Sequence, residues 1–309
     1  MTVIDRTDTT GIAITPRSPT ICADISGAHL GDDLSDKAIG VIRQALLDHK
    51  VVFFRDQDIT TEQHLDFARR FGDLEIHPFT VNDPDRPEVL RITHDADHPG
   101  RENNWHSDVT WRLQPSLGSV LRCIESPELG GDTLFADMYA AYDGLPQRIK
   151  ERVEGRVARH DFPHFRTGLR KRGATEAEIE ALQEQYPNPE HPVIRTHPET
   201  GRKGIYVNSA FTQQIVGMDP DESAELLQLL YDQAKFPEYQ VRFSWEENSI
   251  AFWDNRSCQH YAVSDYWPHT RRVERVTIVG DTPYYDPDQA PTDVPEHPFR
   301  GHLAAWASS

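Results

Sequence analysis

The sequence predicts a mainly β fold with flanking helices, arranged as an antiparallel β-sandwich or jelly roll. Two helical segments come first, and a long succession of short strands and loops follows from about Val89. Helices followed by many strands favour a sheet packed against helices over an alternating α/β fold. The chain has 309 residues and is 37% hydrophobic, which is enough for a substantial core.

The first part of the chain contains two helix signals separated by a strand. Apolar residues recur at helical spacing after Ser35, so this segment is expected to be a helix with one buried face. The run Val51–Phe54 is β-branched and aromatic, as in a buried strand. A second helix is expected from Thr60, because Gln63 stands at the capping-box position and Gly72 favours its end.

Strands dominate the rest of the chain, with two helices inserted. Asp219 as N-cap and Pro220 in the first turn predict one helix, and residues 175–183 are expected to form another. Three strands are expected, the first of them from a strict alternation of apolar and polar residues, at 239–245, 249–253 and 276–279. One domain is expected over residues 1–309, with its core at about 12–282 and a Pro-rich tail at 283–309.

Composition argues against several classes of partner. The net charge of −18 and the lack of a long basic run disfavour nucleic acid and anionic membranes. No run approaches the ~18 apolar residues of a membrane span, and the polar N-terminus does not resemble a signal peptide. Three widely spaced cysteines argue against a disulfide framework and for a reducing compartment, so a cytoplasmic location is expected.

A His-x-Asp pair and a distant histidine form a candidate metal site. On a strand or extended loop, the side chains of His106 and Asp108 project to the same side and reach one ion. His260 is the best third ligand. Two histidines and one carboxylate with open positions form the facial triad of non-haem Fe(II) oxygenases. Two alternatives remain: a zinc hydrolase with the same ligands, and a structural His106–Asp108 contact in a non-catalytic jelly roll with His260 at the surface.

Two arginines downstream of His260 are candidates for binding anions. A chelating dicarboxylate cosubstrate needs a cation for its remote carboxylate, and the planar guanidinium group binds carboxylates in a bidentate manner. Arg271 and Arg275 are four residues apart, so on a strand they share one face. An arginine taken alone is more often a solvated side chain, but two of them downstream of a candidate metal ligand favour an anion site.

With these residues in place, the sequence resembles the taurine dioxygenase family of Fe(II)/2-oxoglutarate-dependent oxygenases. The Trp-Asp-Asn-Arg motif and the Gln-His-Tyr-Ala motif that follows it are the most specific part of the likeness. The resemblance implies a double-stranded β-helix of the clavaminate-synthase-like kind and a homo-oligomer, either a dimer or a tetramer. The matching segments are Ile21–Gly31, His49–Asp58, Phe71–Pro78, Trp105–Thr110, Gly130–Leu134, Trp253–Asp265 and Arg271–Asp281.

The resemblance also implies roles for individual residues. His106, Asp108 and His260 match the iron ligands, and Thr133 and Arg271 match the residues that bind the distal carboxylate of 2-oxoglutarate. Contacts with the substrate head group are implied for His77, Val109 and Arg275. Two positions depart from the family pattern: Glu102 stands in place of an asparagine near the taurine amine, and Thr80 in place of a pocket tyrosine.

The activity implied is hydroxylation of a small organic anion, with Fe(II), 2-oxoglutarate and O₂ as cofactors and cosubstrates and with succinate and CO₂ as coproducts. Taurine or a related alkanesulfonate is the first choice of substrate, and its hydroxylation would release sulfite and an aldehyde. Alkyl sulfate esters and phenoxyalkanoates are the alternatives, since the changes at Glu102 and Thr80 affect the substrate pocket alone.

Overall fold

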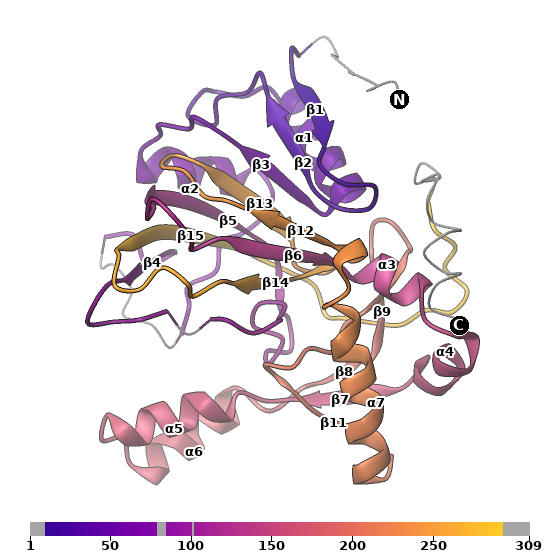
Figure 1. Ribbon diagram of the computed structural model, residues 1–309. Helices are drawn as coiled ribbons and strands as arrows, with labels where there is room; N and C mark the ends of the chain where they lie inside the picture. The colour runs from indigo at the N-terminus through magenta and orange to yellow at the C-terminus, as the bar shows by residue number, and fades with distance from the viewer. Residues whose placement is uncertain (1–9, 79–84, 101, 293–309) are drawn as a thin grey trace.

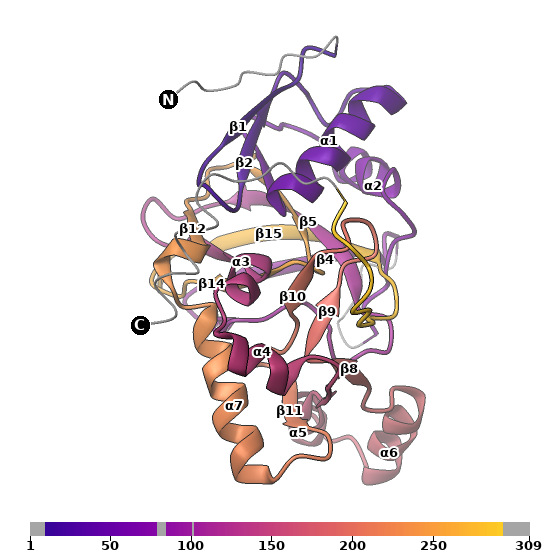
Figure 2. The same ribbon diagram turned by 90° about the vertical axis from the view of Figure 1, so that its right-hand side faces the viewer.

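The computed structural model describes residues 10–78, 85–100 and 102–292. Two facing β-sheets form its centre, with helices on the outer face of the larger sheet and a mixed insertion beyond the smaller one (Figures 1 and 2). The prediction of a mainly β protein with flanking helices is therefore confirmed. No helix in the described ranges is long and apolar enough to cross a membrane.

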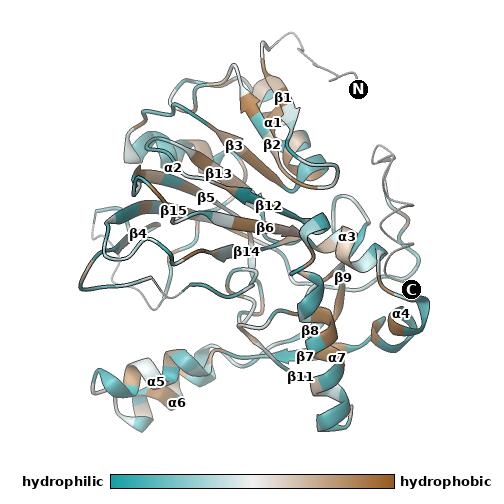
Figure 3. Ribbon diagram, viewed as in Figure 1, coloured by the Kyte–Doolittle hydropathy of each residue, from teal (hydrophilic) through white to brown (hydrophobic). Residues whose placement is uncertain are grey.

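The larger sheet has seven strands and is antiparallel except for the pair β2–β3. Its strands are hydrophobic along much of their length (Figure 3), because both faces are covered. In spatial order they are β1 (Ala13–Pro16), β2 (Ala23–Ser26), β3 (Val51–Phe54), β13 (Ile250–Asp254), β5 (Ser116–Glu125), β15 (Arg271–Val279) and β4 (Val89–His94).

The smaller sheet is antiparallel, with the order β12 (Gln240–Phe243), β6 (Thr133–Asp137) and β14 (Cys258–Ala262). It faces the larger sheet across an apolar cluster that is rich in aromatic side chains. Phe53 of β3 lies 5.7 Å from Phe135 of β6 and stacks on Phe243 of β12 at 3.9 Å, measured between ring centroids. The residues of the candidate site are placed at one end of this interface.

Two helices cover the opposite face of the larger sheet, namely α1 (Asp36–His49) and α2 (Thr61–Arg69). Ser35 caps α1 by accepting a hydrogen bond from the amide of Ala38. Thr60 and Gln63 form the expected capping box of α2. This helix ends at Arg69, slightly earlier than Gly72 suggests.

The insertion between β6 and β12 carries the remaining helices and three further strand pairings. The predicted helices at 175–183 and after Asp219 are confirmed as α6 (Glu176–Gln185) and α7 (Pro220–Gln233), whereas α5 (Pro163–Lys171) was not predicted. In Figure 1, α5 and α6 form a hairpin that projects away from the two sheets. The elements are α3 (Met138–Asp143), α4 (Gln147–Val153), β7 (Val157–His160), α5 (Pro163–Lys171), α6 (Glu176–Gln185), β8 (Glu190–Pro192), β9 (Ile194–Thr196), β10 (Lys203–Ile205), β11 (Thr212–Ile215), α7 (Pro220–Gln233) and the 3₁₀ turn Pro237–Tyr239.

The three expected strands occur with adjusted ends. The alternating segment 239–245 contains only the four residues of β12, while the strand expected at 276–279 extends back to Arg271 in β15. The described part of the Pro-rich tail packs against the insertion, where Tyr284 bridges to Thr196 of β9. Residues 293–309 of the tail lie outside the described residues.

Candidate functional site

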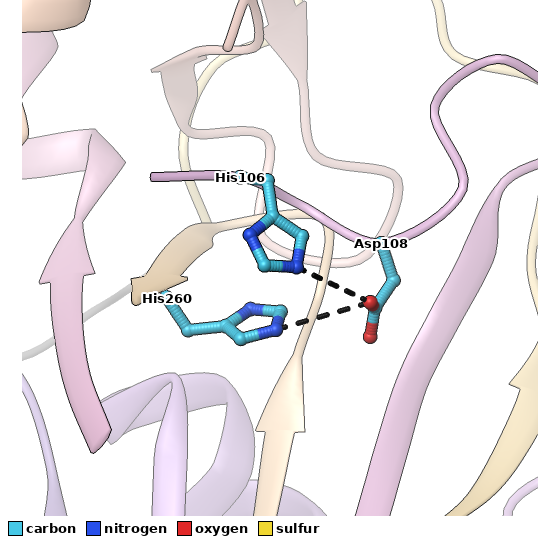
Figure 4. A group of neighbouring side chains, drawn as sticks. All are labelled: His106, Asp108 and His260. Atoms are coloured by element: carbon cyan, nitrogen blue, oxygen red, sulfur yellow. Dashed lines mark ion pairs between the residues drawn. The ribbon is translucent and has the colours of Figure 1, made fainter. Parts of the chain in front are cut away.

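The structure brings His106, Asp108 and His260 together at one end of the sheet interface (Figure 4). His106 and His260 lie opposite each other as an antiparallel pair, because each backbone amide donates to the other's carbonyl at 3.1 and 2.8 Å. The Oδ1 atom of Asp108 is 3.8 Å from the Nε2 atom of each imidazole. These three are the only described group of at least three such side chains placed to share a metal ion.

Hydrogen bonds from distant strands fix the His106–Asp108 segment. The Nδ1 of His106 lies 2.9 Å from the carbonyl of Asn104, so this nitrogen carries the proton and Nε2 offers its lone pair. The side-chain amide of Asn255 accepts from the Asp108 amide at 2.6 Å and donates to the Asp108 carbonyl at 2.9 Å. Ser107 donates to the carbonyl of Cys258 at 2.9 Å, which ties the segment to β14.

The protonation states of the cluster suit metal binding. Burial and the neighbouring His106 lower the pKa of His260 to about 3, so its imidazole is neutral. Burial alone would raise the pKa of Asp108, but the charge of Arg275 and the two imidazoles hold it well below its usual range. A neutral imidazole and an ionised carboxylate are the forms that coordinate cations.

The backbone turns sharply directly after Asp108. Val109 has a φ of +49°, in the left-handed region that a β-branched residue rarely adopts. Such strain persists only where the surrounding structure imposes it, and it is concentrated at functional sites. Val109 itself packs against Trp111 and Phe211.

The donor set fits Fe(II). Two imidazole nitrogens and one carboxylate oxygen on one side of an ion leave three positions open, which is the arrangement of non-haem Fe(II) oxygenases. Two ligand atoms that each lie about 2.0–2.2 Å from one ion are at most about 4.4 Å apart, so both separations of 3.8 Å are compatible with a shared ion.

Arg271 at the start of β15 is a buried cation. It forms no ion pair with a carboxylate in the described part of the chain, and its Nε has no hydrogen-bond partner there. Its guanidinium lies 5.5 Å from the ring centroid of Trp245, whose Nε1 donates to the hydroxyl of Thr133 at 2.9 Å. The Thr133 hydroxyl thus accepts from Trp245 and keeps its own proton for another acceptor. Both groups are therefore available to an external acceptor such as a carboxylate.

Arg275 lies on the same face of β15 as Arg271, as their spacing predicts, but its charge is already compensated. Its Nη1 donates to Oδ1 of Asp108 at 2.9 Å. His77 and Arg275 line a common pocket, and the buried Glu75 lines it too. Glu75 forms a close ion pair with Arg112. Burial and the charge of Arg275 lower the pKa of His77 to about 4.

Glu102 is not among the described residues that line this pocket. Its side chain is about half exposed, at 49%, and lies 3.4 Å from the Nε2 of His94. The backbone carbonyl of Glu102 accepts from the amide of Ala262, two residues after His260. Its expected role as a partner of a substrate amine stays a prediction. Thr80 lies outside the described residues.

Three residues that support the site were missed in the sequence. Asn255 clamps Asp108, Trp245 joins Thr133 to Arg271, and Ser119 donates to Oδ2 of Asp108 at 3.3 Å. Asn255 stands in the conspicuous motif Trp253–Arg256, so the motif was noticed although its contacts were not. No sequence pattern marks Ser119 or Trp245.

Comparison with known proteins gives the family. The family described as "Taurine catabolism dioxygenase TauD, TfdA family" matches residues 13–277. The chain belongs to the TauD/TfdA family. An alkylsulfatase from Acinetobacter baylyi is 38% identical over 267 residues, covering 84% of this chain and 83% of that protein. An alpha-ketoglutarate-dependent sulfate ester dioxygenase from Pseudomonas putida is 35% identical over 273 residues, covering 87% and 89%.

The similarity extends to solved structures of the TauD/TfdA family. A taurine dioxygenase from Burkholderia xenovorans superimposes with a TM-score of 0.76 at 37% identity, covering 91% of this chain and 94% of that one. The chain is therefore a 2-oxoglutarate-dependent dioxygenase that uses Fe(II), 2-oxoglutarate and O₂. The alternatives of a zinc hydrolase and of a non-catalytic jelly roll are set aside.

Proposed function

We propose that this dioxygenase oxidises the carbon next to the head group of an organic sulfate ester or sulfonate that carries an apolar chain. One observation carries the proposal: the site places the hydrogen-bonding side chains of an arginine and a histidine beside an apolar wall. His77 and Arg275 line one pocket, together with Glu75. The apolar cluster of Val109, Trp111 and Phe211 lies beside it, and the ring of Phe211 is 6.3 Å from that of His106.

Sulfate esters are favoured over taurine, the first choice from the sequence. Two similar relatives are named for alkyl sulfates and sulfate esters. The ammonium group of taurine needs a nearby hydrogen-bond acceptor, and the Glu102 side chain is half exposed and paired with His94. An apolar wall favours an alkyl chain over an ammonium group because the charge would lose its hydration there. Phenoxyalkanoates remain an alternative with the same chemistry.

The residues divide the work as follows. His106, Asp108 and His260 hold the iron, and Arg271 and Thr133 bind the far carboxylate of 2-oxoglutarate. When bound, Fe(II) with 2-oxoglutarate and O₂ supplies the oxidation of a C–H bond and leaves succinate and CO₂. His77 and Arg275 orient the sulfate or sulfonate oxygens, and Val109 contacts the head group while its cluster excludes water from the reacting carbon.

The product distinguishes the two substrate types. Hydroxylation of the carbon that bears a sulfate ester gives an unstable product whose C–O bond to the sulfate group breaks, which yields an aldehyde and sulfate. Hydroxylation next to a sulfonate leads to cleavage of the C–S bond and yields an aldehyde and sulfite. In both cases the hydroxyl proton leaves as the carbonyl forms.

The remaining expectations form part of the same proposal. Two facing, mainly antiparallel sheets support a double-stranded β-helix, or jelly roll, of the clavaminate-synthase-like kind, in a single domain over residues 1–309. The three free, buried cysteines suit a reducing, cytoplasmic location. A homo-oligomer, either a dimer or a tetramer, stays a prediction.

The test is succinate formation by Fe(II)-loaded protein with 2-oxoglutarate and O₂, in the presence of hexyl sulfate, hexanesulfonate, taurine or phenoxyacetate. We expect the alkyl sulfate to stimulate succinate formation most strongly, with equal amounts of aldehyde and sulfate. Stimulation by taurine with sulfite release, and none by hexyl sulfate, would contradict the substrate assignment. If metal-loaded protein formed no succinate with any of the four, the whole proposal would fail.

A further inference from the structure

Trp111 forms part of the wall beside the candidate metal site. It follows Asp108 by three residues, is 5% exposed and packs with Val109 and Phe211 in one apolar cluster. Its ring also lies 6.5 Å from that of His77, measured between centroids. One side of the indole therefore faces the chamber that holds the proposed head-group residues.

The other side of Trp111 faces the hairpin formed by α5 and α6. The indole stacks on Phe162 at 6.1 Å with 15° between the ring planes, and it meets the edge of Tyr186 at 5.9 Å. Phe162 directly precedes α5 and Tyr186 directly follows α6. Trp111 is thus the residue that joins the base of the hairpin to the site.

Behind Trp111 the hairpin contains a second pocket. The enclosed space between its side chains is about 30 Å³, room for about one water molecule, and it opens toward solvent. Trp111 itself lines this pocket, together with mainly apolar side chains of the hairpin, among them Phe162, Phe165, Leu169, Ile179, Leu182 and Tyr186. Removing the indole would join its own volume to this space and open an apolar route from the active site into the hairpin.

We propose that Trp111 is the residue that limits substrate size, by separating the reaction chamber from the apolar pocket inside the α5–α6 hairpin. The inference rests on the proposed function, because it takes the substrate to be an organic anion with an apolar tail. The indole blocks the route toward Leu182, so tails that extend past the chamber are excluded or remain in water. Removing the indole connects the two spaces and admits longer tails.

The experiment compares four proteins: the natural chain, Trp111→Ala, Leu182→Trp and the double variant. Leu182→Trp fills the hairpin pocket from behind and leaves Trp111 in place. Binding of butyl, hexyl, octyl and decyl sulfate is measured by calorimetry on the metal-free proteins with 2-oxoglutarate present. Succinate formation is measured in parallel on the Fe(II)-loaded proteins, and affinity for 2-oxoglutarate serves as a control for folding.

In the natural chain we expect affinity to stop rising once the tail fills the chamber. In Trp111→Ala it continues to rise by about three- to fourfold per additional buried methylene. Leu182→Trp alone leaves the chain-length profile unchanged, and in the double variant it abolishes the gain. If Trp111→Ala does not fold, Trp111→Leu tests the same opening with a smaller loss of volume.

Two results would overturn the inference. The first is a Trp111→Ala profile identical to that of the natural chain. The second is weaker binding of octyl or decyl sulfate by Leu182→Trp alone, since the tail would then already pass Trp111. Failure of the proposed function looks different, because the natural chain would then respond to no sulfate or sulfonate of any length.

Discussion

The proposed site lies between two regions that are packed in different ways, the strands β6, β14 and β15 of the sandwich and the hairpin α5–α6. Thr133, His260 and Arg271 of the strands are all buried. In the two helices of the hairpin, Ile179 is the only buried residue. Residues that need fixed geometry therefore stand on the rigid side, while the side next to the proposed substrate tail depends on few contacts and tolerates change more easily.

The largest effect is expected from removing a ligand on the rigid side. His106→Ala should abolish stoichiometric Fe(II) binding and lower activity by more than the roughly 10- to 100-fold that loss of an outer-shell partner causes. Metal content after dialysis and succinate formation are the measurements. His98→Ala is the matched control, because this histidine is exposed and pairs with Asp95. Full activity of His106→Ala would refute the ligand assignment.

The second-largest effect is expected from removing the proposed cationic partner of 2-oxoglutarate, Arg271. Arg271→Gln should weaken 2-oxoglutarate binding by about 30-fold or more, since losing one partner of a buried charge pair costs about 2–5 kcal/mol. The neighbouring Arg272→Gln is the control, because Arg272 is half exposed and pairs with Glu125 at 3.5 Å. Calorimetric titration with 2-oxoglutarate measures both. Equal affinities in the two variants would remove Arg271 from the cosubstrate site.

A smaller effect is expected at Trp245, which supports Arg271 and Thr133 without being a proposed ligand of 2-oxoglutarate. Trp245→Phe keeps an aromatic face for Arg271 but removes the donor to Thr133. One lost hydrogen bond contributes about 1 kcal/mol, so affinity for 2-oxoglutarate should fall about fivefold. Trp267→Phe is the control, as this indole is 63% exposed. An unchanged affinity in Trp245→Phe would show that Thr133 needs no such support.

Most elements of the sandwich can be predicted from the sequence, because the patterns that indicate them span only neighbouring residues. Helix α1 and strand β3 follow from the spacing of apolar residues, and the His106–Asp108 pair follows from the two-residue period of an extended chain. The support of the site is not predictable in this way. Asn255 holds Asp108 from across the fold, and such a contact depends on tertiary packing that no local period encodes. The resemblance to a known family supplied the roles of Thr133 and Arg271 instead.

In the α5–α6 hairpin, one of the two helices could be predicted from the sequence and the other could not. Helix α6 was predicted, and its capping box at Thr175 and Glu178 is present. Helix α5 was not predicted, because no regular run of buried apolar residues marks it and none of its residues is buried. Its sequence instead mixes Phe165 and Leu169 with basic residues. A segment with little buried surface leaves little hydrophobic periodicity to read.

The smallest effect on overall stability is expected inside the hairpin. Phe252→Ala in the sandwich should lower the free energy of unfolding by about 3–5 kcal/mol, as for other buried phenylalanines. Ile179→Ala should change it by less than about 1 kcal/mol, because a segment with one buried side chain opens locally before the domain unfolds. Its effect should appear as faster amide hydrogen exchange confined to α5 and α6. If Ile179→Ala destabilised the whole domain as much as Phe252→Ala, the hairpin would be part of the cooperative core, and the contrast between the two sides of the site would not hold.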